Sequence, residues 1–145
     1  TNPRRLALAR YDEAAGQWTL LKSQVDVGNA ILTGWTNHFS FFAPFLVDPG
    51  SNVLDVNIFP IPWEPGSNDA LHNSPVLTFT KLPAEARVRI YNITGELVDE
   101  VTAPPNGVLA WEGTNRYGRK VGSGTYMVLI EYGGQRAVRR FVLIR

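Results

Sequence analysis

Hydrophobic and polar residues alternate over short stretches of the chain, with turn-forming residues between them. In the segment 4–11, Leu6 and Leu8 fall on one face, and Ala7 and Ala9 fall on the other. A period of two residues predicts a β-strand, and no stretch has the apolar stripe of an amphipathic helix. The same pattern predicts strands over 17–21, 25–29, 30–36, 53–59, 75–80, 87–91, 96–101, 108–111, 125–132 and 136–144, the last two as a hairpin across Gly133 and Gly134.

Turn-forming residues divide the chain into two parts. The 13 glycines and 10 prolines suit many short strands better than long helices. The stretch Asp48–Asn52 combines Asp, Pro, Gly, Ser and Asn, all of which favour turns, so it predicts a hinge. The second half carries about six or seven strands, near the ~7 of an immunoglobulin-like module. We therefore predict an all-β protein, with a smaller β-strand segment (residues 1–50) followed by an immunoglobulin-like β-sandwich (residues 51–145).

The segment 36–45, TNHFSFFAPF, holds four of the seven phenylalanines. Alternation places Phe39, Phe41 and Phe45 on one face, and Phe42 with Leu46 on the other. A strand that is apolar on both faces is normally central in its sheet. The segment therefore predicts a buried central strand.

Residues 1–47 are too few to cover that strand by themselves. Chains below about 40 residues rarely fold alone, and slightly longer ones are marginal. The candidates for the cover are the second domain, sequence upstream of Thr1, or another copy of the chain. A homo-oligomer formed through strand contacts is the partner expected. The predicted partner-binding residues are Leu6, Leu8, Phe39, Phe41, Phe42 and Phe45.

Charge and composition exclude several classes. The net charge of +1 argues against a nucleic-acid-binding protein, which normally has a strongly basic face. No apolar run reaches the roughly 18 residues of a membrane span. Cysteine is absent, which excludes disulfides and thiolate chemistry. Because the chain opens at Thr1 without a signal peptide, we expect a processed protein or part of a longer one.

Catalytic and metal sites are not expected. The two histidines, His38 and His72, lie in different predicted parts, and neither Ser40 nor Ser74 sits in a nucleophile-elbow motif. We predict no enzyme activity, no metal and no cofactor. A calcium site would need six to eight oxygen ligands, so turn formation is the favoured role of the Asx residues Asp48, Asn52, Asp55, Asn57, Asn68 and Asp69.

Two surface roles stay open. The arginines at 4, 5, 10, 136, 139 and 140 are expected to face outward and discourage edge pairing, with contact to phosphate or an anionic glycan as the alternative. The tryptophans Trp18, Trp35 and Trp63 are expected in core or loop-anchoring roles, with stacking on sugar rings as the alternative. Asn92-Ile93-Thr94 forms a glycosylation sequon that we interpret as incidental.

A series of motifs in the second half carries a family resemblance: Phe59–Gly66, Leu77–Pro83, Val88–Val98, Trp111–Asn115 with Gly118, and Val121–Tyr126. Together they resemble the immunoglobulin-like domain of flagellar hook-capping proteins, and they are similar to the C-terminal sorting domains of type IX secretion. Ile61 and Glu112 depart from the usual Asn and Asp of this pattern. The resemblance implies an immunoglobulin-like fold with Gly95 in a strand-joining turn, Trp111 in the core, and Gly122 and Gly124 at a tight strand entry.

The first half resembles the end of a β-sandwich module of bacterial surface proteins, through Tyr11-Asp12-Glu13, Gln17-Trp18 and Thr36–Ser40. Both resemblances imply a secreted or cell-surface location. Three functions follow as hypotheses. The first is a non-catalytic structural module that assembles through β-strands, in its sharpest form a filament subunit. The second is a secretion and anchoring domain of a large exported protein, and the third is a carbohydrate-binding accessory module.

Overall fold

The computed structural model describes residues 2–37 and 39–145. The chain forms two compact units, Thr1–Asp48 (unit 1) and Pro49–Arg145 (unit 2). The predicted all-β class is confirmed, because the elements are antiparallel strands and two short 3-10 turns, η1 (Pro3–Arg5) and η2 (Val53–Asp55). Within the described part of the chain, no helix has the length and apolar character needed to cross a membrane.

Unit 1 consists of five short strands, β1 (Leu6–Asp12), β2 (Gln17–Leu20), β3 (Ser23–Asp26), β4 (Ile31–Gly34) and β5 (Phe42–Leu46). Three of them form an antiparallel sheet in the order β2-β1-β5, and the other two form the hairpin β3-β4. Among the described residues of unit 1, the buried hydrophobic ones are two alanines, Ala7 and Ala9. Unit 1 therefore lacks a core of large side chains among its described residues.

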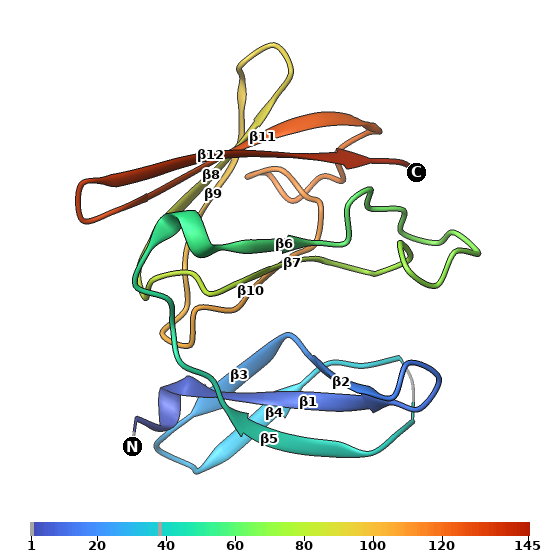
Figure 1. Cartoon of the computed structure of the whole chain (residues 1–145), viewed down its shortest axis with the longest axis vertical. Helices are drawn as coiled ribbons and strands as arrows, with labels where there is room; N and C mark the ends of the chain where they lie inside the picture. Colours follow the sequence, from blue (N-terminus) through green and yellow to red (C-terminus); the bar gives the residue numbers. More distant parts are fainter. Residues whose placement is uncertain (1, 38) are drawn as a thin grey trace. The chain divides into compact units, whose positions relative to one another are not determined.

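Unit 2 is a sandwich of seven strands, drawn as two layers in Figure 1: β6 (Asn57–Phe59), β7 (Leu77–Thr80), β8 (Arg87–Asn92), β9 (Leu97–Thr102), β10 (Leu109–Trp111), β11 (Gly124–Tyr132) and β12 (Gln135–Leu143). One sheet has the order β10-β7-β6 and the other β12-β11-β8-β9. The third strand, β8, pairs with the sixth, β11, as in immunoglobulin-like sandwiches. The fourth strand, β9, stays with β8 as a hairpin instead of joining the first sheet.

Aromatic rings fill the centre of the sandwich. Trp63, Trp111 and Phe141 are buried with ring centroids 5.7 to 6.5 Å apart, and Tyr126 stacks on Phe141 at 5.3 Å. The polar atoms of these rings are satisfied, as burial requires. Trp111 Nε1 donates to Asp99 Oδ2 at 3.0 Å, and Trp63 Nε1 donates to a backbone oxygen. The Tyr126 hydroxyl donates to the backbone oxygen four residues earlier, and burial raises the pKa of Tyr126.

Two local predictions meet different outcomes. Gly95 has φ +86° in the β8–β9 turn, so the expected turn role is confirmed. A side chain at Gly122 would meet nothing within 4 Å, so the prediction of a tight strand entry is wrong there, whereas Gly124 has φ +157°, a conformation that side chains rarely adopt. The glycine that packing does require is Gly113, because a Cβ there would lie 2.7 Å from the ring of Trp63 and its φ is +74°.

The predicted strand 53–59 is only half correct. Its first part is the 3-10 turn η2, and pairing begins at Asn57. The cause is local, because the side chain of Asn52 accepts a hydrogen bond from the backbone N–H of Leu54 and caps the turn. Side chains of this type compete with strand pairing by offering the backbone a nearby acceptor.

Replacing Phe141 with alanine tests the aromatic core. Phe141 is fully buried against three other rings, so the truncation should lower the free energy of unfolding of unit 2 by roughly 3–5 kcal/mol. Val138→Ala is the matched control, because Val138 lies on the opposite, exposed face of the same strand. This substitution should change the free energy of unfolding by less than about 0.5 kcal/mol. Urea unfolding followed by tryptophan fluorescence measures the free energy of unfolding of both variants. Equal losses of this free energy in the two variants would contradict the assignment of Phe141 to the core.

Candidate interaction surface

One face of the β2-β1-β5 sheet is built around the two buried alanines of β1. Trp18 on β2 and Phe45 on β5 flank this strand, and their ring centroids lie 5.3 Å apart, so the rings meet across it. Tyr11 extends the row, with its ring centroid 5.3 Å from that of Trp18. We call Tyr11, Trp18 and Phe45 the aromatic face. Small residues on the central strand leave room for large neighbours, but Trp18 stays 44% exposed and Phe45 38% exposed.

The opposite face of this sheet carries Leu6 and Leu8, two of the predicted partner-binding residues. Both are half-buried. The backbone N–H of Leu8 donates to Ser23 Oγ at 2.9 Å, and a Cβ at Gly34 would lie 2.7 Å from the Leu8 side chain. Leu8 therefore packs against the β3-β4 hairpin within unit 1.

The four predicted phenylalanines do not form one strand. Phe39 and Phe41 precede β5 and are exposed, Phe39 completely. Phe42 and Phe45 lie within β5 and point to opposite faces, as alternation predicted. The structure thus brings Phe45 together with Tyr11 and Trp18, which are not among the six predicted partner-binding residues. That the six predicted residues bind a partner stays a prediction.

Strand β5 is an edge strand, so the prediction that it is central is wrong for the described sheet. Tyr11 N on β1 donates to Phe41 O at 2.8 Å, and Val47 N donates to the backbone oxygen of Arg5, directly before β1, at 2.9 Å. The backbone N–H and C=O groups of successive residues alternate between the two sides of a strand. In β5 those of the even-numbered residues therefore point away from β1, and the middle one of these residues is Pro44. Proline has no N–H, so the open edge lacks a donor at its centre. Proline at such a position discourages the addition of a further strand.

The outward face of the β12-β11-β8-β9 sheet carries a charged row that sequence reasoning did not assemble. Arg89 donates to Glu100 on β9 at 2.9 Å and to Glu131 on β11 at 3.1 Å. Arg87 lies 3.5 Å from Glu100, and Arg136 on β12 lies 3.7 Å from Glu131. The hydrogen bond to Glu100 raises the pKa of Arg89. The row crosses all four strands, and the alternating charges of 87–91 were its only signal in the sequence.

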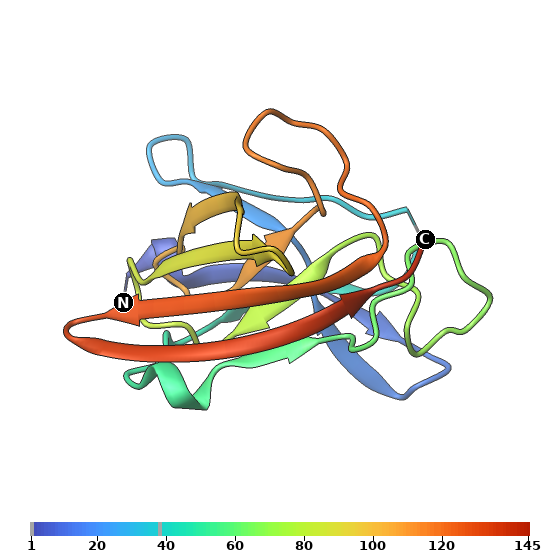
Figure 2. The same cartoon turned by 90° about the horizontal axis from the view of Figure 1, so that it is seen from above.

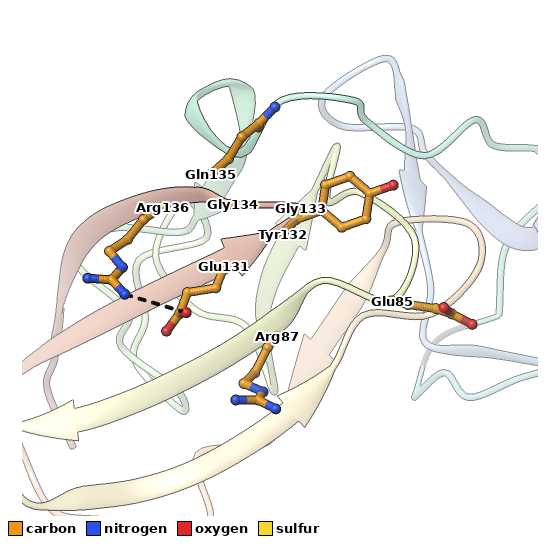
Figure 3. A pocket seen from close by; sticks show the side chains of 8 residues that line it. All are labelled: Glu85, Arg87, Glu131, Tyr132, Gly133, Gly134, Gln135 and Arg136. Carbon is orange, nitrogen blue, oxygen red and sulfur yellow. Dashed lines mark ion pairs between the residues drawn. The ribbon is translucent and has the colours of Figure 1, made fainter.

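A polar hollow of about 340 Å³ lies beside the charged row, where the β11–β12 hairpin turns. Figure 3 shows Glu131 and Arg136 turned toward each other, while Glu85 points away from them. None of the eight lining residues is a histidine, serine or cysteine. The hollow therefore has charged groups for a polar contact, but its lining offers no pair of nucleophile and base.

The residues weighed for catalysis are separated. Ser40 Oγ donates to the backbone of Tyr11, and Ser74 Oγ donates to that of Val76, so neither hydroxyl donates to a histidine. His72 pairs with Asp69, with 2.6 Å between Nδ1 and Oδ2, and this hydrogen bond lowers the pKa of Asp69. His38 lies outside the described residues.

Trp63 is fully buried, as its expected core role requires, so the alternative of stacking on a sugar ring is excluded for it, whereas Trp18 and Trp35 are about half exposed. One expected surface role needs correction. Arg139 does not face outward as predicted. Its guanidinium donates to the backbone oxygen of Val56 at 2.8 Å.

Restoring a donor at the centre of the β5 edge should promote association. In Pro44→Val, the new N–H completes the outward row of backbone groups, so the protein should form larger species as its concentration rises. Light scattering coupled to size exclusion measures this. Pro3→Val, in the 3-10 turn η1, is the control and should behave as the parent protein. A Pro44→Val variant with the same size as the parent at every concentration would contradict the guarding role of Pro44.

The fold has a counterpart among solved structures. No family model and no curated protein matches the sequence. PorZ, an essential bacterial surface component of the type IX secretion system of Porphyromonas gingivalis, matches with a TM-score of 0.55 and 23% identity, covering 72% of this chain and 14% of PorZ. Dimeric latent PorU of the same organism matches with a TM-score of 0.42 and 23% identity, covering 61% of this chain and 9% of PorU. The chain thus spans a small part of either protein, and the likeness to PorZ shows a shared fold. Neither structure is a flagellar hook-capping protein, so that particular relationship stays a prediction.

Proposed function

We propose that the chain is a non-catalytic module of an exported bacterial protein, and that unit 2 serves export to the cell surface, or anchoring there, through type IX secretion. One combination of observations carries the proposal. The chain shares a fold with part of PorZ, unit 2 is a seven-stranded sandwich, and its sequence contains, in order, the motifs that resemble type IX sorting domains. The motif glycine Gly113 and the motif tryptophan Trp111 both pack in its aromatic core.

Filament assembly through β5 has less support. Strand addition needs an edge with free donors and acceptors, and Pro44 interrupts that edge. In unit 2 the end of β12 is occupied by the chain itself, because Trp63 N donates to Val142 O at 2.8 Å and Ile144 N donates to Trp63 O at 2.9 Å. The aromatic face offers no flat platform for a sugar, since its neighbouring rings are tilted by 56° and 58°. Assembly and glycan binding stay predictions.

The outward face of the four-stranded sheet is the surface best suited to recognition by export machinery. The charged row lies on it beside Met127 and Val138, which are exposed hydrophobic residues. Charged groups around an apolar patch give a partner both orientation and buried area. Arg136 and Arg140 on β12 belong to this face, because they alternate with the inward-facing Phe141.

A secretion assay tests the proposal. The whole chain is fused behind a periplasmic reporter in Porphyromonas gingivalis, and reporter is measured at the cell surface and in the medium. We expect the fusion to leave the cell and the reporter alone to stay inside. The double substitution Arg136→Ala with Arg140→Ala should reduce export several-fold, because it removes charge from the outward face without touching the core.

Two controls separate recognition from folding. Deleting residues 136–145 would also remove Phe141 and Leu143 from the core, so it cannot distinguish the two causes. Circular dichroism of the purified double variant should match the parent, whereas Phe141→Ala marks the outcome of a damaged fold. Retention of the parent fusion inside a cell with a working secretion system would overturn the proposal.

A further inference from the structure

The long loop between β6 and β7 gathers three metal-binding side chains. Glu64, Asp69 and His72 each bring one ligand atom to a common point, and these atoms all lie within 4.8 Å of one another. Figure 2 shows this loop, in green, projecting beyond the ends of the strands that it joins. Glu64 and His72 are half-buried and Asp69 is exposed, so an ion from solution can reach the site without any opening of the fold.

Hydrogen bonds that do not involve the three ligand side chains close the loop at its base, and within the loop the Asp69 side chain accepts from the backbone N–H of Leu71 at 3.0 Å. Trp63 anchors its start in the core, and Trp63 Nε1 donates to the backbone oxygen of Ser74 at 2.7 Å, which closes the loop at its base. The N–H of Glu64 donates to the carbonyl of His72 at 2.9 Å, so these two residues face each other across the loop. A second bond, from Gly66 N to Asn73 Oδ1 at 2.8 Å, repeats the connection. The ligand atoms are thus ordered in advance, and binding does not have to order the chain.

The charge of the cluster is uncompensated. Elsewhere in unit 2, Glu100 and Glu131 each pair with arginines. Within the described part of the chain, no lysine or arginine forms an ion pair with Glu64 or Asp69, and the side chain paired with Asp69 is the imidazole of His72. Two carboxylates this close repel each other. A divalent cation would neutralise both.

The kind of ligand atom selects the ion. Calcium takes six to eight oxygen ligands, whereas imidazole nitrogen suits zinc and related transition metals. In its catalytic sites zinc binds three protein side chains, among them His and Glu, and keeps a fourth position for water, so three such ligands suffice to hold the ion.

We propose that Glu64, Asp69 and His72 form a Zn²⁺ site with a fourth position open to solvent. Binding replaces the Asp69–His72 hydrogen bond with two bonds to the metal and uses small movements of side chains on a fixed backbone. The site goes beyond the proposed export function and does not depend on it.

Isothermal titration calorimetry of the whole, metal-free chain with zinc chloride tests the site. We expect one ion per chain, and a loss of affinity of at least about tenfold in both His72→Ala and Glu64→Gln, the second of which keeps the size of the side chain. His38→Ala is the matched control, because it removes the other histidine of the chain, and it should bind as the parent does. A large excess of calcium should not displace the zinc.

Thermal unfolding with and without zinc provides a second measurement. The parent and His38→Ala should unfold at a higher temperature with zinc, and the two loop variants should not, although all four should share one circular dichroism spectrum without metal. The proposal is overturned if the parent binds no zinc below millimolar concentration. It is equally overturned if the loop variants bind zinc as tightly as the parent, or if His38→Ala loses as much affinity as they do.

Discussion

The packing of Trp63 against Trp111 and Phe141 is the contact on which unit 2 depends. Trp63 does not lie in a strand of either sheet, yet it is completely buried and its backbone hydrogen-bonds to the end of β12. This single residue therefore joins the outer strand of one sheet, the aromatic core and the base of the loop that follows β6. Gly113 is fixed by the same contact, because a side chain there would collide with the Trp63 ring. A loop held this rigidly at its base can carry ligand atoms in fixed positions.

Unit 1 is organised on a different principle. The buried residues of its central strand are alanines. The rings of Trp18 on β2 and Phe45 on β5 contact each other across this strand and remain partly exposed. Burial of apolar area is the main favourable term in folding, so a sheet with this arrangement is stabilised much less than a sandwich with a filled interior. Pro44 limits the use of the open β5 edge for pairing. Side-chain contacts over the aromatic face are then the means by which another body would cover unit 1.

Alternation along the chain predicted most of unit 2, because a strand with one buried face carries its own signal. Val88 and Ile90 are fully buried between outward arginines, as that pattern required. The same reasoning failed for 53–59, where the side chain of Asn52 caps a 3-10 turn. It also failed for β5, because alternation defines the faces of a strand but not its neighbours. Alternation also could not predict clusters that form across loops, because it does not say which distant residues become neighbours. Glu64 and His72 are eight residues apart in the sequence and are brought together by a backbone hydrogen bond.

Amide hydrogen exchange of the whole chain tests most directly the claim that unit 2 has its own core and unit 1 does not. Amides open locally with a free energy that reflects the packing around them. We predict that the slowest exchange falls on β7, β8, β11 and the part of β12 around Phe141, and that the amides of β1, β2 and β5 exchange much faster in dilute monomeric protein. Protection of β1 equal to that of β8 in the monomer would contradict the account, because it would require an interior in unit 1 that two alanines cannot supply.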